Sequence, residues 1–132
     1  MTTAAVLAAP RRRPSARLAY AALAALLVAA IVLEIVKHGT GYRQLALFGL
    51  GPDLALFYGA SPGLARGQLH PRAVRAYNLA HRFAGPLVLA ALAGSGVLPI
   101  GYLAGALAWA LHISVDRAVG YGLRTRDGFQ RA

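Results

Sequence analysis

Four apolar stretches, separated by short polar or glycine-rich segments, follow one another along the chain. A helix needs about 20 mostly apolar residues to cross a bilayer, and two of the stretches reach that length. The second is shorter, and Pro52 is expected to bend it. The pattern predicts an all-α fold, a four-transmembrane-helix bundle with short loops. The predicted spans are 18–36, about 45–60, about 73–98, and from the turn at 99–101 to about 119.

The flanks of these spans set the predicted domain organisation. Residues 1–16 are expected to form a flexible basic N-terminal tail, 17–123 the four-helix transmembrane domain, and 124–132 a polar C-terminal tail. The first span resembles a signal peptide in position, but it is long for one. Glu34 lies near its end and Lys37 and His38 follow it, without a small-residue cleavage pattern. An uncleaved membrane anchor is therefore favoured.

Composition and charge agree with a polytopic membrane protein. The 132 residues are 58% hydrophobic and 14% charged, with a mean hydropathy of +0.53. The net charge of +10 would suit nucleic acid, but the basic residues lie between the apolar spans, as in loops that face the cytoplasm and anionic lipid. We therefore expect a lipid bilayer as the partner, and no nucleic acid.

The basic residues also predict the orientation. By the positive-inside rule, their distribution places both the N- and C-termini in the cytoplasm. No cysteine is present, which excludes disulfides and thiolate metal sites. One side would carry Arg11, Arg12, Arg13, Arg17, Arg66, Arg72, Arg75, Arg124, Arg126 and Arg131, and the other only Lys37 and Arg43.

Ionisable side chains within the apolar stretches are the main candidates for function. Asp53, His81, His112 and Asp116 lie where such groups are rare unless they face one another or a wet cavity. His112 and Asp116 are four residues apart, so they share one helical face, as do Asn78 and His81 at a spacing of three. Two imidazoles and two carboxylates would neutralise one divalent cation such as zinc, manganese or iron.

Two other interpretations stay open on spacing alone. Arg82 and Arg117 could neutralise Asp53 and Asp116 as buried ion pairs, with the histidines and Asn78 as interhelical hydrogen-bonding groups. The chain would then be a non-enzymatic structural or interaction protein whose polar residues hold helices together or form the surface of a homo-oligomer. A transporter or proton relay would instead need Glu34, near the outer end of the first span, to continue the polar path.

The candidate residues lie within a series of short motifs: Pro52-Asp53-Leu54, Tyr58-Gly59, Tyr77-Asn78-Leu79-Ala80-His81, Pro86, Trp109-Ala110-Leu111-His112-Ile113, Asp116 through Leu123, and Gly128-Phe129. The order of these motifs resembles the family called domain of unknown function 4260, a set of small bacterial membrane proteins. The resemblance covers about residues 17–129 and implies a multi-pass protein of the bacterial inner (plasma) membrane. The chain departs from the family pattern after Phe129, where Gln130, Arg131 and Ala132 replace a Thr-His-Leu-like stretch.

The family name implies no established activity, but its polar motif positions coincide with the candidate residues. A looser similarity in residue types links them to bacterial membrane-bound metal-dependent hydrolases. On that hypothesis the metal ligands are Asp53, His81, His112 and Asp116, and the metal lowers the pKa of a bound water. Asn78 or Tyr121 would orient that water or the substrate, and Arg117 would bind a phosphate or carboxylate group of a substrate that the sequence does not identify.

Overall fold

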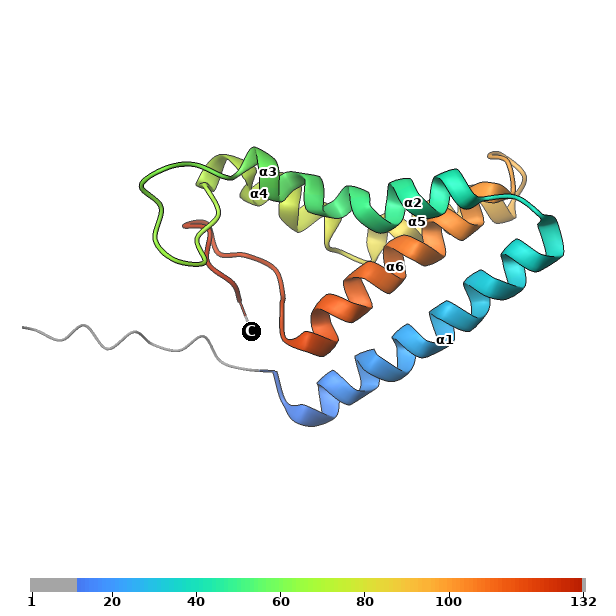
Figure 1. The fold of residues 1–132 in the computed structure, drawn as a ribbon, viewed down its shortest axis with the longest axis horizontal. Helices are drawn as coiled ribbons and strands as arrows, with labels where there is room; N and C mark the ends of the chain where they lie inside the picture. The colour runs from blue at the N-terminus through green and yellow to red at the C-terminus, as the bar shows by residue number, and fades with distance from the viewer. Residues whose placement is uncertain (1–11, 132) are drawn as a thin grey trace, which may run out of the picture.

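The computed structural model describes residues 12–131 as an all-helical chain, which confirms the predicted fold class (Figure 1). No strand occurs in this range, and the extended C-terminal residues contribute only an isolated bridge between Arg124 and Gln130. Most of the expected N-terminal tail lies outside the described residues. The elements are α1 (Pro14–His38), α2 (Tyr42–Leu50), the 3-10 turn η1 (Gly51–Asp53), α3 (Leu54–Tyr58), α4 (Pro71–Ala80), α5 (Ala84–Gly94) and α6 (Gly101–Val119).

Helix α1 is the one described helix long and apolar enough to cross a membrane. Pro14 opens it, where the missing N–H costs nothing, and Gly39 ends it with φ of 64°. Its 25 residues extend about 37 Å, more than the hydrocarbon core of a bilayer. Ile31 is its one buried residue, so most of its apolar surface faces outward.

The second and third expected spans are each interrupted. In the second, the 3-10 turn around Pro52 separates α2 from α3. In the third, the sequence predicted a continuous span, but α4 and α5 are separate helices, and the chain turns at residues 81–83. Pro86 lies in the first turn of α5, and its ring would clash with the carbonyl of Arg82 in an unbroken helix. Four complete membrane crossings therefore remain a prediction.

Side chains of α6 compensate for this break. Trp109 donates its indole Nε1–H to the carbonyl of Ala80 at 2.6 Å, and Arg117 donates to the carbonyl of His81 at 2.8 Å. Carbonyls released at the end of α4 are thus hydrogen-bonded, as backbone groups in an apolar environment must be. The two halves of the interrupted helix are therefore held by α6.

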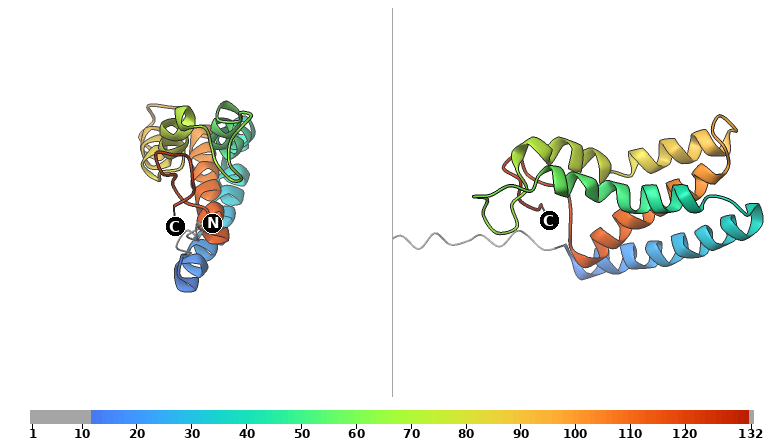
Figure 2. Two further views of the ribbon diagram at one scale, coloured as in Figure 1. Left: turned by 90° about the vertical axis from the view of Figure 1, so that its left-hand side faces the viewer. Right: turned by 45° about the horizontal axis from the view of Figure 1, so that its top comes forward.

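Helix α6 is the centre of the fold and packs against α1, α2 and α5 (Figure 2). Small residues on its buried faces allow the close approach: Gly101 lies against Gly41, and Gly105 lies against Phe48 and Gln44 of α2. Arg17 donates from its Nε to the carbonyl of Ala118 at 2.7 Å, which joins the start of α1 to the end of α6. The two helices are therefore antiparallel.

Packing between α5 and α6 depends on Gly85. A Cβ atom at this position would overlap the ring of Trp109, so we expect Gly85→Ala to lower the free energy of unfolding by about 1–3 kcal/mol. Gly94→Ala in the same helix is the matched control, because its Cβ would meet nothing within 4 Å. This substitution should leave the free energy of unfolding unchanged or raise it by up to about 1 kcal/mol. Denaturant titration in detergent measures the stability of both variants. Equal effects would contradict a close contact between Gly85 and Trp109.

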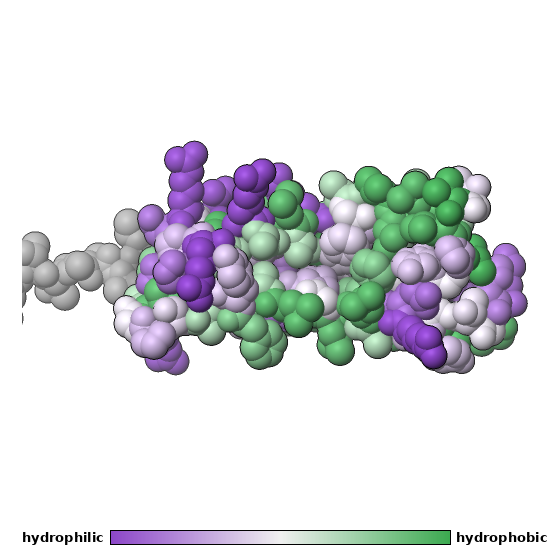
Figure 3. All heavy atoms as spheres, turned by 90° about the horizontal axis from the view of Figure 1, so that it is seen from above, coloured by the Kyte–Doolittle hydropathy of each residue, from purple (hydrophilic) through white to green (hydrophobic). Residues whose placement is uncertain are grey.

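The residues after α6 fold back over α4. Gly120 ends α6 with φ of 102°, and Leu69 donates its N–H to the carbonyl of Gly128 at 2.9 Å. Seen from above, the molecule has hydrophilic residues at its two ends and a hydrophobic surface over much of the region between them (Figure 3). The C-terminal residues belong to one polar end, next to the candidate site.

Candidate metal centre

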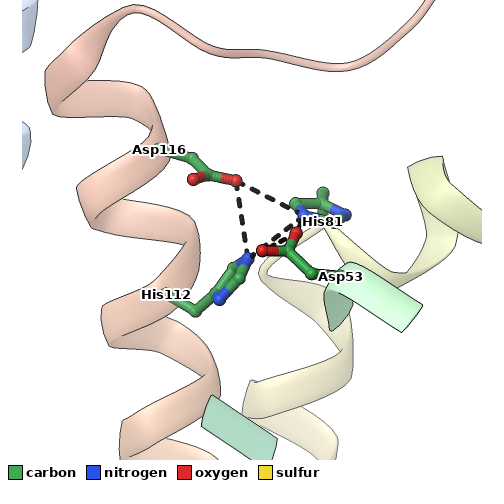
Figure 4. A group of neighbouring side chains, drawn as sticks. All are labelled: Asp53, His81, His112 and Asp116. Atoms are coloured by element: carbon green, nitrogen blue, oxygen red, sulfur yellow. Dashed lines mark hydrogen bonds and ion pairs between the residues drawn. The ribbon is translucent and has the colours of Figure 1, made fainter. Parts of the chain in front are cut away.

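Three separate segments bring four ionisable side chains together (Figure 4). Asp53 comes from the 3-10 turn η1, and His81 from the residue that caps the C-terminus of α4. His112 and Asp116 share one face of α6, as their spacing predicted. The interruptions of the second and third spans therefore lie where these segments supply Asp53 and His81.

Five of the six distances within the cluster are close to those of tetrahedral metal coordination. Zinc bonds of 2.0–2.1 Å to nitrogen and oxygen give a ligand-to-ligand edge of about 3.3–3.4 Å in a regular tetrahedron. The four ligand atoms all lie within 4.8 Å of one another, which is the upper bound for the sixth edge, between the carboxylates of Asp53 and Asp116. The measured edges are 3.2 Å (His112 Nε2–Asp53 Oδ1), 3.3 Å (His81 Nε2–Asp116 Oδ2), 3.3 Å (His81 Nε2–His112 Nε2), 3.4 Å (His81 Nε2–Asp53 Oδ1) and 3.6 Å (His112 Nε2–Asp116 Oδ2).

Backbone carbonyls fix the orientation of both imidazoles. His81 Nδ1 lies 2.8 Å from the carbonyl of Tyr77, and His112 Nδ1 lies 2.8 Å from the carbonyl of Gly49. A carbonyl only accepts, so each Nδ1 carries a hydrogen, and the Nε2 of each neutral ring presents its lone pair to the cluster. Such an outer hydrogen bond is usual for a metal-binding histidine.

A positive charge at the centre of the cluster would stabilise it. With both rings neutral, two lone pairs and two carboxylate oxygens converge, an arrangement that is repulsive by itself. Protonation of one imidazole would supply a single charge. Protonation of both would point two N–H groups at each other, because the Nε2 atoms of His81 and His112 are only 3.3 Å apart. One divalent cation would balance both carboxylates and bind all four atoms.

The cluster is closed on the imidazole side and open on the carboxylate side. The side chain of His81 is fully buried and that of His112 is 12% exposed, whereas Asp116 is 22% and Asp53 46% exposed. A pocket of about 400 Å³ adjoins the two carboxylates. A water or substrate atom can therefore approach the cluster from this pocket, which is lined by Asp53, Leu56, Tyr77, Asp116, Tyr121 and Arg124, among others.

The three residues expected to assist catalysis occupy different positions. Tyr121 is 53% exposed and lines the pocket. Arg117 is buried, and its guanidinium donates to the carbonyls of His81 and Tyr121 at 2.8 and 3.3 Å. Asn78 uses its amide for two hydrogen bonds to the backbone of Arg124, at 2.7 and 3.0 Å. Arg117 and Asn78 thus contact backbone groups that border the cluster.

The ion pairs differ from those of the non-metal interpretation. Within residues 12–131, both Asp53 and Asp116 pair with histidines and with no arginine. Glu34, the residue that a transport route would require, pairs with His38 at 3.2 Å. The described contacts therefore favour a shared cation over arginine neutralisation.

Sequence reasoning missed two residues that support His81. The ring of Tyr77 stacks on the imidazole with centroids 3.9 Å apart and planes 16° apart. The guanidinium of Arg124 lies over the ring of Tyr77, 4.8 Å from its centroid. The spacing of four between Tyr77 and His81 was a usable signal, because it places both on one helical face. No local pattern indicated that Arg124 would return to this helix.

The comparisons with known proteins give one match. The profile of the family described as Domain of unknown function (DUF4260) matches residues 17–132, and the chain belongs to this family. The searches of curated proteins and of solved structures found no match. Any functional conclusion therefore depends on the geometry of the cluster.

Proposed function

We propose that this member of the DUF4260 family is a membrane-embedded hydrolase that depends on a divalent metal ion. The observation that carries the proposal is the convergence of four potential ligand atoms from Asp53, His81, His112 and Asp116, five of whose six separations are close to tetrahedral edge lengths. The open carboxylate side supports a catalytic role. Four protein ligands would complete a tetrahedron, so a water or substrate atom arriving from the pocket would bind as a fifth ligand, or in place of the 46% exposed carboxylate of Asp53.

The surface of the molecule supports placement in a membrane. Leu18, Leu26 and Leu33 of α1 are 71%, 69% and 67% exposed, a cost in water that a lipid environment removes. Helix α6 has 19 residues, nearly enough to cross a bilayer beside α1. We further propose four crossings of the bacterial inner membrane, with both termini and the cluster toward the cytoplasm, as the basic residues favour.

Zinc is the favoured metal. It accepts four-coordinate tetrahedral sites of nitrogen and oxygen ligands, and the measured edges fit its bond lengths. Manganese or iron(II) would need further ligands, which water in the adjoining pocket would have to supply. Metal analysis of the purified protein distinguishes the three.

The residues around the cluster suggest a division of roles. A bound metal would lower the pKa of its water to about 7 and so supply a hydroxide nucleophile. Tyr121 would orient the water or the substrate from the rim of the pocket. Arg117 and Asn78 would act as positioning residues, because they hold the backbone at His81 and at Arg124.

Metal removal tests the proposal. Dialysis of the detergent-purified protein against a chelator should abolish ester hydrolysis and lower the melting temperature, because the four acceptor groups then lose their shared cation. Adding back about one equivalent of zinc should restore both. Magnesium serves as the control, since it binds such a nitrogen-containing site poorly. Turnover that survives complete metal removal would refute the proposal.

Measuring both hydrolysis and the melting temperature distinguishes a catalytic metal from a metal that has only a structural role. The cluster joins η1, α4 and α6, so a metal that only holds helices together would occupy the same position. In that case chelation should lower the melting temperature while no preparation hydrolyses esters, amides or phosphoesters. The chain would then be a non-enzymatic membrane protein with a structural metal.

A further inference from the structure

An apolar groove reaches the cluster at His112 and is not lined by Asp53 or Asp116. It has a volume of about 510 Å³, lies between α1, α2 and α6, and is walled by Val28, Ile31, Leu45, Leu50 and Leu111 among others. His112, one of the four candidate ligands, lines it as well. So does Gly49, whose carbonyl accepts the hydrogen bond from His112 Nδ1.

The cluster therefore borders two different environments. His112 contributes to the groove, whereas Asp53 and Asp116 contribute to the polar pocket. The pocket offers hydrogen-bonding groups from Tyr121 and Arg124. A molecule that bridges both would have an apolar chain on one side of the metal and a polar group on the other.

The groove opens on the apolar surface of the molecule. Val28 and Val32 form its edge on α1, and they are 48% and 54% exposed on the helix that is long enough to cross a membrane. A hydrocarbon chain can enter there from the bilayer without crossing a polar surface. A water-soluble substrate would not need an apolar entrance and would reach the metal through the polar pocket alone.

We propose, on the basis of the proposed function, that the substrate is a membrane lipid. Its hydrocarbon chain lies in the groove, and its ester, amide or phosphoester bond lies at the metal centre. Hydrolysis adds the hydroxyl of water to the acyl carbon or phosphorus. The bond to the leaving oxygen or nitrogen breaks, and that atom takes the proton.

Photo-crosslinking tests the position of the chain without requiring turnover. The probe is a phosphatidylcholine with a diazirine at the end of one acyl chain, added at one probe per protein in detergent. We expect labelled peptides from residues 28–32, 45–50 and 108–111, and competition by unlabelled dipalmitoyl lipid. Labelling that spreads evenly over α5 and the outer face of α1 would overturn the inference.

Groove-filling variants sharpen this test. Ala46→Trp on α2 and Val32→Trp on α1 should each reduce labelling of the groove about tenfold, because an indole would occupy the chain's volume. Val88→Trp is the matched control, since Val88 lies in a separate apolar groove between α5 and α6. Metal content at the wild-type level would show that the cluster still forms. Undiminished labelling in both groove-filling variants would contradict the assignment.

A chain-length series separates this inference from the proposed function. Wild-type protein should hydrolyse para-nitrophenyl palmitate in preference to the butyrate, and Ala46→Trp should reduce that preference about tenfold. Hydrolysis without chain-length preference would refute the lipid substrate and leave the hydrolase intact. Specific labelling of the groove in a protein that hydrolyses neither ester would refute the hydrolase and leave lipid binding intact.

Discussion

Replacing His112 with alanine is expected to reduce the metal content from about one ion per chain to less than about a tenth, and to abolish hydrolysis. The substitution removes one of the four ligands and leaves only Asp53, His81 and Asp116 to bind the metal. Two carboxylates and one imidazole provide an incomplete coordination shell. Elemental analysis of detergent-purified protein, with equilibrium dialysis against zinc, measures the loss.

Two further variants make this result specific. His38→Ala removes an imidazole that pairs with Glu34 outside the cluster, so its metal content should equal that of the wild type. Asp53→Asn changes a side chain that is 46% exposed and keeps its shape, so loss of metal in this variant cannot be attributed to unfolding. Full metal occupancy in both His112→Ala and Asp53→Asn would refute the metal centre.

Gly128→Ala should produce the largest loss of stability, about 3 kcal/mol or more, and lower the melting temperature by about 10 °C. Gly128 has φ of 95°, and its Cβ would overlap the carbonyl oxygen of Leu69. The C-terminal residues would have to leave α4, which also breaks the hydrogen bond from Leu69 N–H to Gly128 O. Thermal unfolding in detergent measures the effect.

Gly63→Ala is the control for this substitution. Gly63 also has a positive φ, 80°, but its Cβ would meet nothing within 4 Å. Only backbone strain remains, with a cost of about 1 kcal/mol. Equal losses of stability in the two variants would mean that the contact between residue 128 and Leu69 contributes nothing.

Gly128→Ala should also weaken metal binding, because it displaces the C-terminal residues, and among them Arg124 stacks on Tyr77 beside His81.

The sequence predicted the all-helical fold and the residues of the cluster because both depend on local signals. Apolar periodicity marks helices, and a spacing of four places His112 and Asp116 on one face of α6. Convergence with Asp53 and His81 was inferred from the cost of isolated charge in an apolar environment. These arguments need no knowledge of which helices are neighbours.

Other features depended on tertiary contacts and could not be predicted. Pro86 was a local signal for the break after α4, but nothing near residue 80 in sequence indicates that Trp109 and Arg117 bind the released carbonyls. Asn78 looked like a cluster residue because it shares a face with His81, but its amide binds the backbone of Arg124, 46 residues away. Long-range hydrogen bonds leave no periodic pattern.

The capping of the α4 carbonyls by α6 also bears on how the protein would respond to bilayers of different thickness. If the chain lies in a bilayer as proposed, sliding α6 along α4 would leave the carbonyls of Ala80 and His81 without donors in an apolar environment, at a cost of several kcal/mol each. In the proposed membrane, α1 would tilt together with α6, because the two helices pack against each other and Arg17 bonds to the carbonyl of Ala118. The distances between the four ligands should therefore stay constant in thin and thick membranes alike.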